Sequence, residues 1–127
     1  MEEDFWAVLS GAAGVAVLVP AARIVWGALP QDAPYPAIVL NVISGKPGLT
    51  YAGPDRLRRH RVQVDCYATN SPGVVVLARA VETALNGFRG QNFLGIFLED
   101  WRASREPEPT GGPFRISIDF ITQWRAP

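Results

Sequence analysis

Few side chains in this 127-residue sequence could act as a nucleophile, a base or a metal ligand. The sequence has one cysteine, Cys66, and one histidine, His60. A disulfide framework is therefore excluded, as is a histidine- or cysteine-based metal site. His60 lies between Arg59 and Arg61, which disfavours a protonated ring and provides no carboxylate to orient it. Cys66 alternates with valines on the apolar side of an expected strand, where a thiol behaves as a small hydrophobic group. We expect neither residue to be catalytic.

Carboxylates are the remaining candidates for acid–base chemistry, and beyond the N-terminus they form two pairs. Glu99 and Asp100 are neighbours in an expected strand, so their side chains should point to opposite faces and should not act on one bond. Glu106 and Glu108 lie among prolines in an expected loop. We expect both pairs to be solvated or paired with arginine. The sequence also lacks a glycine-rich phosphate loop, a dinucleotide fingerprint and a nucleophile elbow. It therefore predicts no enzyme and no cofactor.

One concentration of positive charge stands out. Its members are Arg56, Arg58, Arg59, His60 and Arg61. Binding of nucleic acid would require interleaved aromatic rings, and Tyr51 is the one aromatic residue nearby. The cluster could instead pair with acidic groups of a neighbouring subunit, because guanidinium groups bind carboxylates with defined geometry. A solvated strand end is the third interpretation, and the sequence leaves all three open.

Charge and composition exclude several classes of protein. Twelve basic and twelve acidic side chains cancel, so no net charge drives general binding to nucleic acid or to anionic membranes. Hydrophobic residues make up 48% and charged residues 19% of the chain, which predicts a folded protein. The acidic N-terminus is unlike a secretory signal, and the most apolar stretch, 11–22, is too short to span a bilayer.

These candidates must be positioned by helices and strands that the hydrophobic pattern predicts. We expect helices over 4–12, with Asp4 as N-cap, and over 72–86, with Ser71 as N-cap and Gly87 after its end. A further helical turn is expected over 14–19, before Pro20. The expected strands cover 23–26, 37–44, 57–69, 93–101 and 114–124.

The order of these elements predicts an α+β fold. One-sided alternation of apolar residues requires a covering layer, so we expect a two-layer sandwich. In it, an antiparallel sheet of about four strands is covered on one face by two helices. The 127 residues should form a single domain with a protruding loop or arm around 45–60, which is rich in proline and glycine.

The strand expected over 93–101 is apolar on both faces. Simple alternation places Phe97 and Trp101 on one face, opposite Ile96 and Leu98. One face should then contact another molecule, with self-association as the economical solution. Burial of both faces under the helices is the alternative that remains open.

Several segments of the chain together resemble a known family. The segments are Leu29-Pro30, Tyr35 to Val39, Ser44-Gly45, Leu57 to Asp65 (LRRHRVQVD), the helix from Ser71 to Gly87 and the strand from Phe114 to Trp124. The most specific part is Arg59, Arg61 and the strand sequence RVQVD, followed by a helix that ends in Leu85-Asn86-Gly87-Phe88. This pattern resembles the tail completion family of long-tailed phages, also called tail terminator or head-tail joining proteins, which occurs in gene transfer agents as well.

The resemblance implies a non-enzymatic structural protein of the virion that is assembled in the host cytoplasm. Its subunits would form a ring, as a hexamer, which caps the tail tube, ends polymerisation of the major tail tube protein and contacts head-completion or adaptor proteins of the neck. DNA would pass through the lumen without specific binding, and no membrane would be involved. The interface residues expected on this basis are Tyr51, Arg56, Arg58, Arg59, Arg61 and Trp101. Alternatives are a head-completion or neck adaptor protein, and a small α+β module that binds nucleic acid or a ligand.

Overall fold

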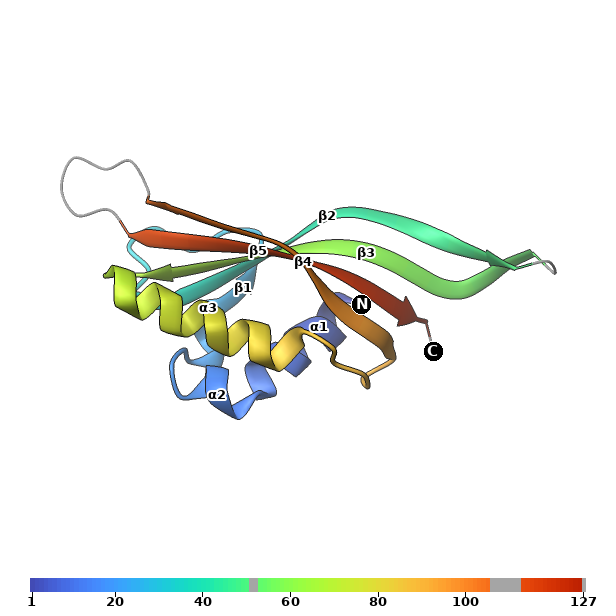
Figure 1. The fold of residues 1–127 in the computed structure, drawn as a ribbon, viewed down its shortest axis with the longest axis horizontal. Helices are drawn as coiled ribbons and strands as arrows, with labels where there is room; N and C mark the ends of the chain where they lie inside the picture. The colour runs from blue at the N-terminus through green and yellow to red at the C-terminus, as the bar shows by residue number, and fades with distance from the viewer. Residues whose placement is uncertain (51–52, 106–112, 127) are drawn as a thin grey trace.

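A computed structural model describes residues 1–50, 53–105 and 113–126, which form a five-stranded sheet with helices on one face (Figure 1). The elements are α1 (Glu2–Gly11), α2 (Ala13–Ala16), the 3-10 turn η1 (Ala21–Arg23), β1 (Ile24–Trp26), β2 (Ala37–Thr50), β3 (Gly53–Ala68), α3 (Ser71–Leu85), β4 (Phe93–Arg105) and β5 (Phe114–Arg125). The strand order is β1-β2-β3-β5-β4. The expected α+β class is confirmed.

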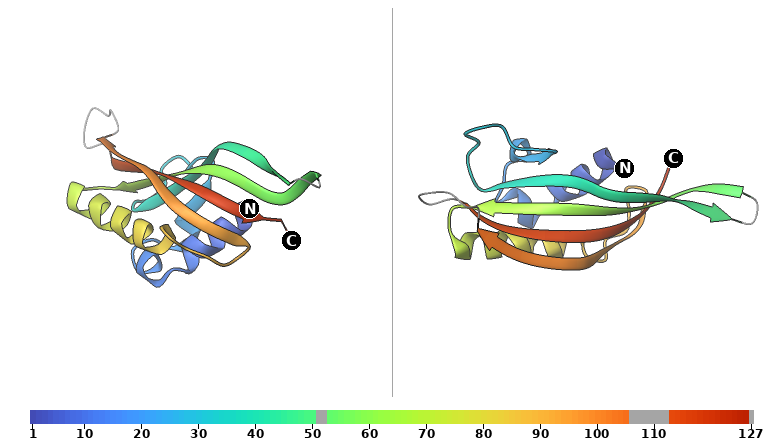
Figure 2. Two further views of the ribbon diagram at one scale, coloured as in Figure 1. Left: turned by 45° about the vertical axis from the view of Figure 1, so that its right-hand side comes forward. Right: turned by 90° about the horizontal axis from the view of Figure 1, so that it is seen from above.

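The sheet has five strands rather than about four, because the three-residue β1 joins its edge. Ile24, Val25 and Trp26 pair with residues 38–40 of β2 in parallel register. All other neighbouring strands are antiparallel. Among the described residues, all helices lie on one side of the sheet and none lies on the other (Figure 2). We call these two sides the helix face and the open face.

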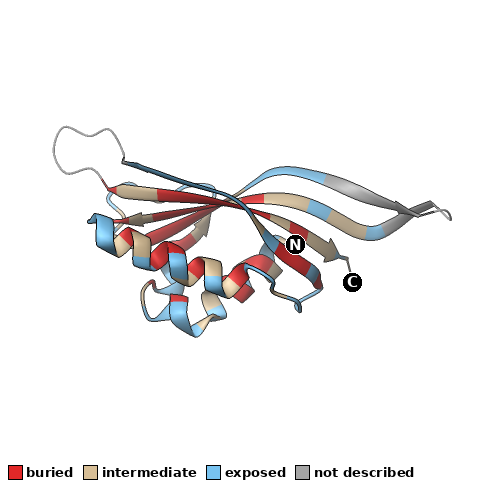
Figure 3. Cartoon of the chain, in the orientation of Figure 1, coloured by how far each residue is buried: buried red, intermediate tan, exposed pale blue. Residues whose placement is uncertain are grey.

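The core lies between α3, α1 and the helix face of the sheet (Figure 3). Val62, Val64 and Cys66 of β3 are fully buried there, as their alternation predicted. Ile118 and Phe120 of β5 are buried beside them. The helix α3 contributes one apolar stripe to this core. Its buried residues are Val74, Leu77, Ala78, Val81 and Leu85.

Both helix starts differ from the expectation by one or two residues. The helix α1 begins at Glu2, so Asp4 lies inside its first turn instead of capping it. The Asp4 carboxylate accepts hydrogen bonds from Trp124 Nε1 (2.7 Å) and Asn92 Nδ2 (3.1 Å). These bonds stabilise the ionised form and lower the pKa of Asp4. Asp4 thus ties α1 to the end of β5.

The cap of α3 is Asn70 rather than Ser71. The Asn70 Oδ1 atom accepts a hydrogen bond from the Gly73 backbone N–H at 2.7 Å, and Ser71 is the first helical residue. Gly87 follows the helix with a φ of 83°, in the left-handed conformation that glycine adopts without strain, as expected for a residue after the helix end.

The position of the cap predicts different losses of stability for substitutions at Asn70 and at Ser71. Asn70→Ala should lower the free energy of unfolding by about 1 kcal/mol, because the first turn loses its side-chain acceptor. Ser71→Ala should change it by no more than about 0.5 kcal/mol. Urea unfolding of both variants measures the difference. An equal loss in both would mean that Ser71 contributes to the cap after all.

Candidate assembly surfaces

The strands β2 and β3 form a long hairpin whose end extends past the rest of the molecule (Figure 1). The strand β3 pairs with β5 only as far as Leu57, which is level with Arg125. Arg56 still accepts a backbone hydrogen bond from Ala126, and beyond it the described residues of β2 and β3 pair only with each other, as in Leu49 with Pro54 and Thr50 with Gly53. We call residues 45–60 the arm. Tyr51, expected at an interface, lies outside the described residues.

The arginines of the expected cluster divide between the two faces of the hairpin. Even-numbered residues of β3 share the helix face with the buried Val62, so Arg56 and Arg58 belong to that face. Arg59 and Arg61 lie on the open face. Arg56 and Arg59 are exposed, whereas Arg58 is half-buried and donates from Nη1 to the Leu57 carbonyl oxygen at 3.1 Å.

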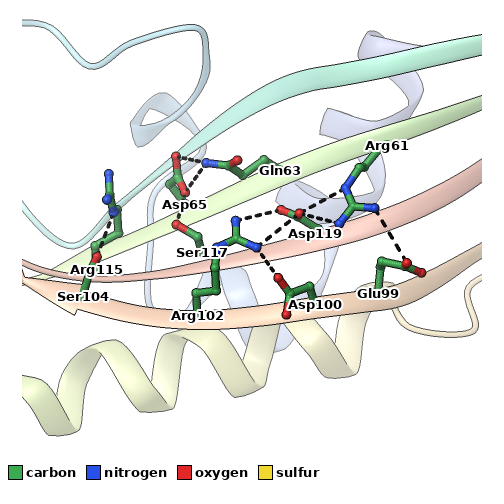
Figure 4. Close-up of polar contacts among 10 residues, drawn as sticks. All are labelled: Arg61, Gln63, Asp65, Glu99, Asp100, Arg102, Ser104, Arg115, Ser117 and Asp119. Atoms are coloured by element: carbon green, nitrogen blue, oxygen red, sulfur yellow. Dashed lines mark hydrogen bonds and ion pairs between the residues drawn. The ribbon is translucent and has the colours of Figure 1, made fainter.

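Arg61 is held by acidic residues of its own chain (Figure 4). Its Nε and Nη2 atoms donate to Asp119 Oδ2 at 3.1 and 2.9 Å, and Nη1 lies 3.7 Å from Glu99 Oε1. Arg102 approaches the same carboxylate from the other side, with Nη2 3.3 Å from Asp119 Oδ1, and also pairs with Asp100. Asp119 is only 5% exposed, and two guanidinium groups compensate its negative charge.

A β-bulge at Glu99 makes this network possible and corrects the expectation for the acidic pair. Leu98 pairs with Phe120 and Asp100 pairs with Asp119, so Glu99 is an extra residue in β4. Glu99 and Asp100 consequently both reach arginines on the open face, instead of pointing to opposite faces (Figure 4). Their expected pairing with arginine is confirmed. Glu106 and Glu108 lie outside the described residues.

Protonation behaviour in the network follows from these contacts. The hydrogen bond from Arg102 is the main cause that lowers the pKa of Asp100. Hydrogen bonds to Asp119 and then to Asp100 raise the pKa of Arg102. Asp100 and Arg102 therefore stay charged near neutral pH. The ion pairs of the network link β3, β5 and β4.

The same bulge changes the placement of the two exposed rings of β4. Phe97 pairs with Ile121 on the open face, whereas Trp101 pairs with Ile118 and lies on the helix face. The expectation that they share a face is therefore wrong. Both rings are 45% exposed on the edge strand β4, Phe97 on the open face and Trp101 on the helix face, where α3 does not cover it fully.

His60 and Cys66 have the environments of structural residues. Burial lowers the pKa of His60, and the nearby Glu2 carboxylate partly opposes this shift. Its Nδ1 atom is buried without a hydrogen bond from the described residues. Burial raises the pKa of Cys66 well above its usual range, so its thiol stays protonated.

A polar hollow lies beside the open face, at the end of the sheet away from the arm. It has a volume of about 700 Å³ and lies between the connection 27–36 and residues of β2 and β3 that include Asn41, Asp65 and Tyr67. The Asp65 carboxylate is already satisfied, because Gln63 Nε2 and Ser117 Oγ donate to it. The carboxylate of Asp65 therefore already has hydrogen-bond partners within the chain.

Metal binding and membrane insertion find no support in residues 1–50, 53–105 and 113–126. No three histidine, cysteine or acidic side chains come together there as metal ligands. Within the same ranges, no helix has both the length and the apolar character needed to cross a membrane.

Asp119 is the central residue that the sequence analysis overlooked. It interrupts an apolar run, Ile116 to Ile121, in the sequence ISIDFI. A carboxylate in a mostly buried strand requires a cationic partner, and that requirement was the available signal. The partner, Arg61, is 58 residues away in the sequence. The strand pairing that brings them together is not visible in either segment alone.

Comparisons with known proteins identify the family. The family model described as Tail completion protein gp17 matches residues 4–124. A chain of the solved structure "Virion of native gene transfer agent (GTA) particle" has the same fold, with a TM-score of 0.62 and 19% sequence identity over 95% of this chain and 91% of that chain. No curated protein matches the sequence. Because the family model spans nearly all of it, the chain belongs to the tail completion protein gp17 family and is a non-enzymatic structural protein of the virion.

Proposed function

We propose that this protein forms a ring, with six subunits, on the end of the tail tube. The ring stops polymerisation of the major tail tube protein and joins the tail to the neck of the head. Its membership of a tail completion family is the observation that carries this proposal. The fold shared with a chain of a gene transfer agent virion supports it.

The shape of the subunit suits a ring. A ring closes when each subunit offers two different surfaces that fit each other, so that every copy contacts the next by the same rotation. The arm is one such surface, because it extends beyond the layer of helices and carries exposed arginines (Figure 3). The exposed edges of the sheet, β1 and β4, supply the other.

The interface residues in this proposal have different roles. Arg56, Arg58 and Arg59 contact acidic groups of another subunit or of the neck, and Tyr51 belongs to the same arm. Trp101 offers an exposed ring on the β4 edge. Arg61 acts indirectly, because its bonds to Asp119 hold the base of the arm against β5.

Passage of DNA fits the charge of the subunit. The formal net charge is zero, so a ring of these subunits has no overall attraction that would retain a polyanion. DNA therefore slides through the lumen without specific contacts.

The test compares particles made with and without this protein. Without it, electron microscopy should show tail tubes of irregular length that are not attached to heads, because nothing ends their growth. Added wild-type protein should restore a uniform length and place one ring on the tube end. Mass measurement of that ring gives the number of subunits.

Two other results would exclude the proposed role. Tubes of normal length that remain separate from heads would assign the protein to the neck, as an adaptor. Normal particles without the protein would remove it from both steps.

A further inference from the structure

An apolar groove at the β1 edge of the sheet carries two acidic side chains at its rim. It has a volume of about 530 Å³ and is lined by Glu2, Glu3, Trp6, Ala7, Ile24 and Trp26. The helix α1 turns Phe5, Val8 and Leu9 toward the core, so the groove is formed by its other side. Exposed apolar surface with a polar rim is typical of a contact site.

The two indole rings of the groove are held in place. Trp6 Nε1 donates to the Ile24 carbonyl oxygen at 2.8 Å, which attaches α1 to β1. The ring of Trp26 contacts that of Phe5, with centroids 6.0 Å apart. Two fixed indole rings that line a groove next to carboxylates offer a guanidinium group both aromatic contact and ion pairs.

Charges at the groove and on the arm are complementary. Glu2 and Glu3 make no ion pair within the described part of the chain, and neither do Arg56 and Arg59. All four side chains are exposed. Because the whole chain has no net charge, such unpaired groups of opposite sign can compensate each other between copies.

A subunit cannot bring Arg56 to Trp26 of its own groove. Trp26 is level with Leu40 and hence with Val64 of β3, and Arg56 lies eight residues further along that strand, a distance of about 26 Å. The Arg56 carbonyl oxygen also accepts a bond from the Ala126 N–H, which holds it on the β5 side. Glu2 lies nearer to the arm, because its carboxylate is close to His60. An arginine that stacks on Trp26 must therefore come from another copy.

We propose that the groove formed by Trp6, Trp26, Glu2 and Glu3 receives the arm of the next subunit, with Arg56 as the main contact and Arg59, on the opposite face of the same strand, as a further positive charge. The inference rests on the proposed ring and names its two complementary surfaces. The contact is head to tail, because arm and groove are different surfaces of one chain.

Charge reversal tests this pairing. The arm variant carries Arg56→Glu and Arg59→Glu, and the groove variant carries Glu2→Arg and Glu3→Arg. On tail tubes, each variant alone should associate with itself at least tenfold more weakly than the wild type does, because like charges meet at every contact. An equimolar mixture should recover it, since alternating subunits pair opposite charges at every contact. Alternation closes only rings with an even number of subunits.

Controls separate this inference from the proposed ring. Arg79→Glu with Glu82→Arg makes the same kinds of change on α3 and should leave association unchanged. Circular dichroism confirms that every variant is folded. The pairing is wrong if the arm variant or the groove variant alone associates as well as the wild type, or if their mixture does not recover association. Either result leaves the proposed ring itself untouched. Wild-type protein that fails to associate on tubes would overturn both.

Cross-linking gives an independent test of the same contact. Ala7→Cys in one batch and Arg59→Cys in a second place one accessible thiol in the groove and one on the arm, since Cys66 is buried, and both leave Arg56 in place. On tubes, a short bismaleimide should join the two batches into dimers, and these are intermolecular by design. As a control, protein with Thr83→Cys on α3 is used in place of the Ala7→Cys protein, and no dimers should form. Equal yields from Ala7→Cys and Thr83→Cys would contradict the proposal.

Discussion

Phe120→Ala should lower the free energy of unfolding by about 3–5 kcal/mol. Phe120 is fully buried in β5, between Val62 of β3 and Leu98 of β4, and it faces the helices. Alanine would remove its buried apolar surface and leave a cavity, because the sheet is held by hydrogen bonds on both sides and cannot collapse. A domain of this size has a total stability of about 5–15 kcal/mol, so the loss would take much of it.

The matched control is Phe97→Ala, on the neighbouring strand. Its ring is 45% exposed on the open face, so the same truncation should cost only about 1 kcal/mol. Urea unfolding of both variants gives the two values. A similar loss in both would mean that a further layer covers the open face in the isolated protein.

The second large effect is expected from the ionic network. Arg61→Met should lower the free energy of unfolding by about 2 kcal/mol, because the buried Asp119 loses two charge-assisted hydrogen bonds. The loss stays below that of a fully buried ion pair, since Arg61 is 32% exposed and Arg102 still contacts Asp119. Chemical denaturation measures this loss.

Arg59→Met is the control for that change. Arg59 lies on the same strand and face, two residues away, but is exposed and makes no ion pair with the described residues. Its replacement should change the unfolding free energy by no more than about 0.5 kcal/mol. In a double-mutant cycle, Arg61→Met with Asp119→Asn should show clear coupling, whereas Arg59→Met with Asp119→Asn should be additive. Coupling in both pairs would contradict a specific role for Arg61.

Sequence reasoning located the regular elements because their pattern is local. The residues Val62, Val64 and Cys66 alternate without interruption, and the strand that contains them pairs with β5 without a register shift. The apolar stripe of α3 repeats every three or four residues and was placed within one residue of its bounds. At the start of that helix, two adjacent residues had suitable side chains, and propensity could not decide between them.

The faces of β4 were not predictable in the same way. Strict alternation assigns Trp101 to the side of Phe97, and one inserted residue, Glu99, reverses that assignment for the rest of the strand. A bulge is fixed by pairing with β5, which is absent from the local sequence. The position of Arg61 beside Asp119 depends on the same long-range pairing.

The end of the hairpin shows a second limit of local patterns. Pro47, Gly48, Gly53 and Pro54 are typical of loops, yet strand pairing continues through Leu49 with Pro54 and Thr50 with Gly53. Low strand propensity was outweighed there by the register of β2 on β3. The sequence had left a loop and a hairpin arm as alternatives, and it could not fix the register.

The strand order also bears on when the chain can fold during synthesis. The last strand in the sequence, β5, lies between β3 and β4, and its pairing with β3 joins residues 46 to 68 positions apart. Until the ribosome has released β5, the nascent chain has neither the strand that connects β4 to the sheet nor the ring of Phe120. Such late closure of distant contacts slows folding and leaves strand edges open to other chains. We therefore expect this domain to complete its fold only once β5 has left the ribosome.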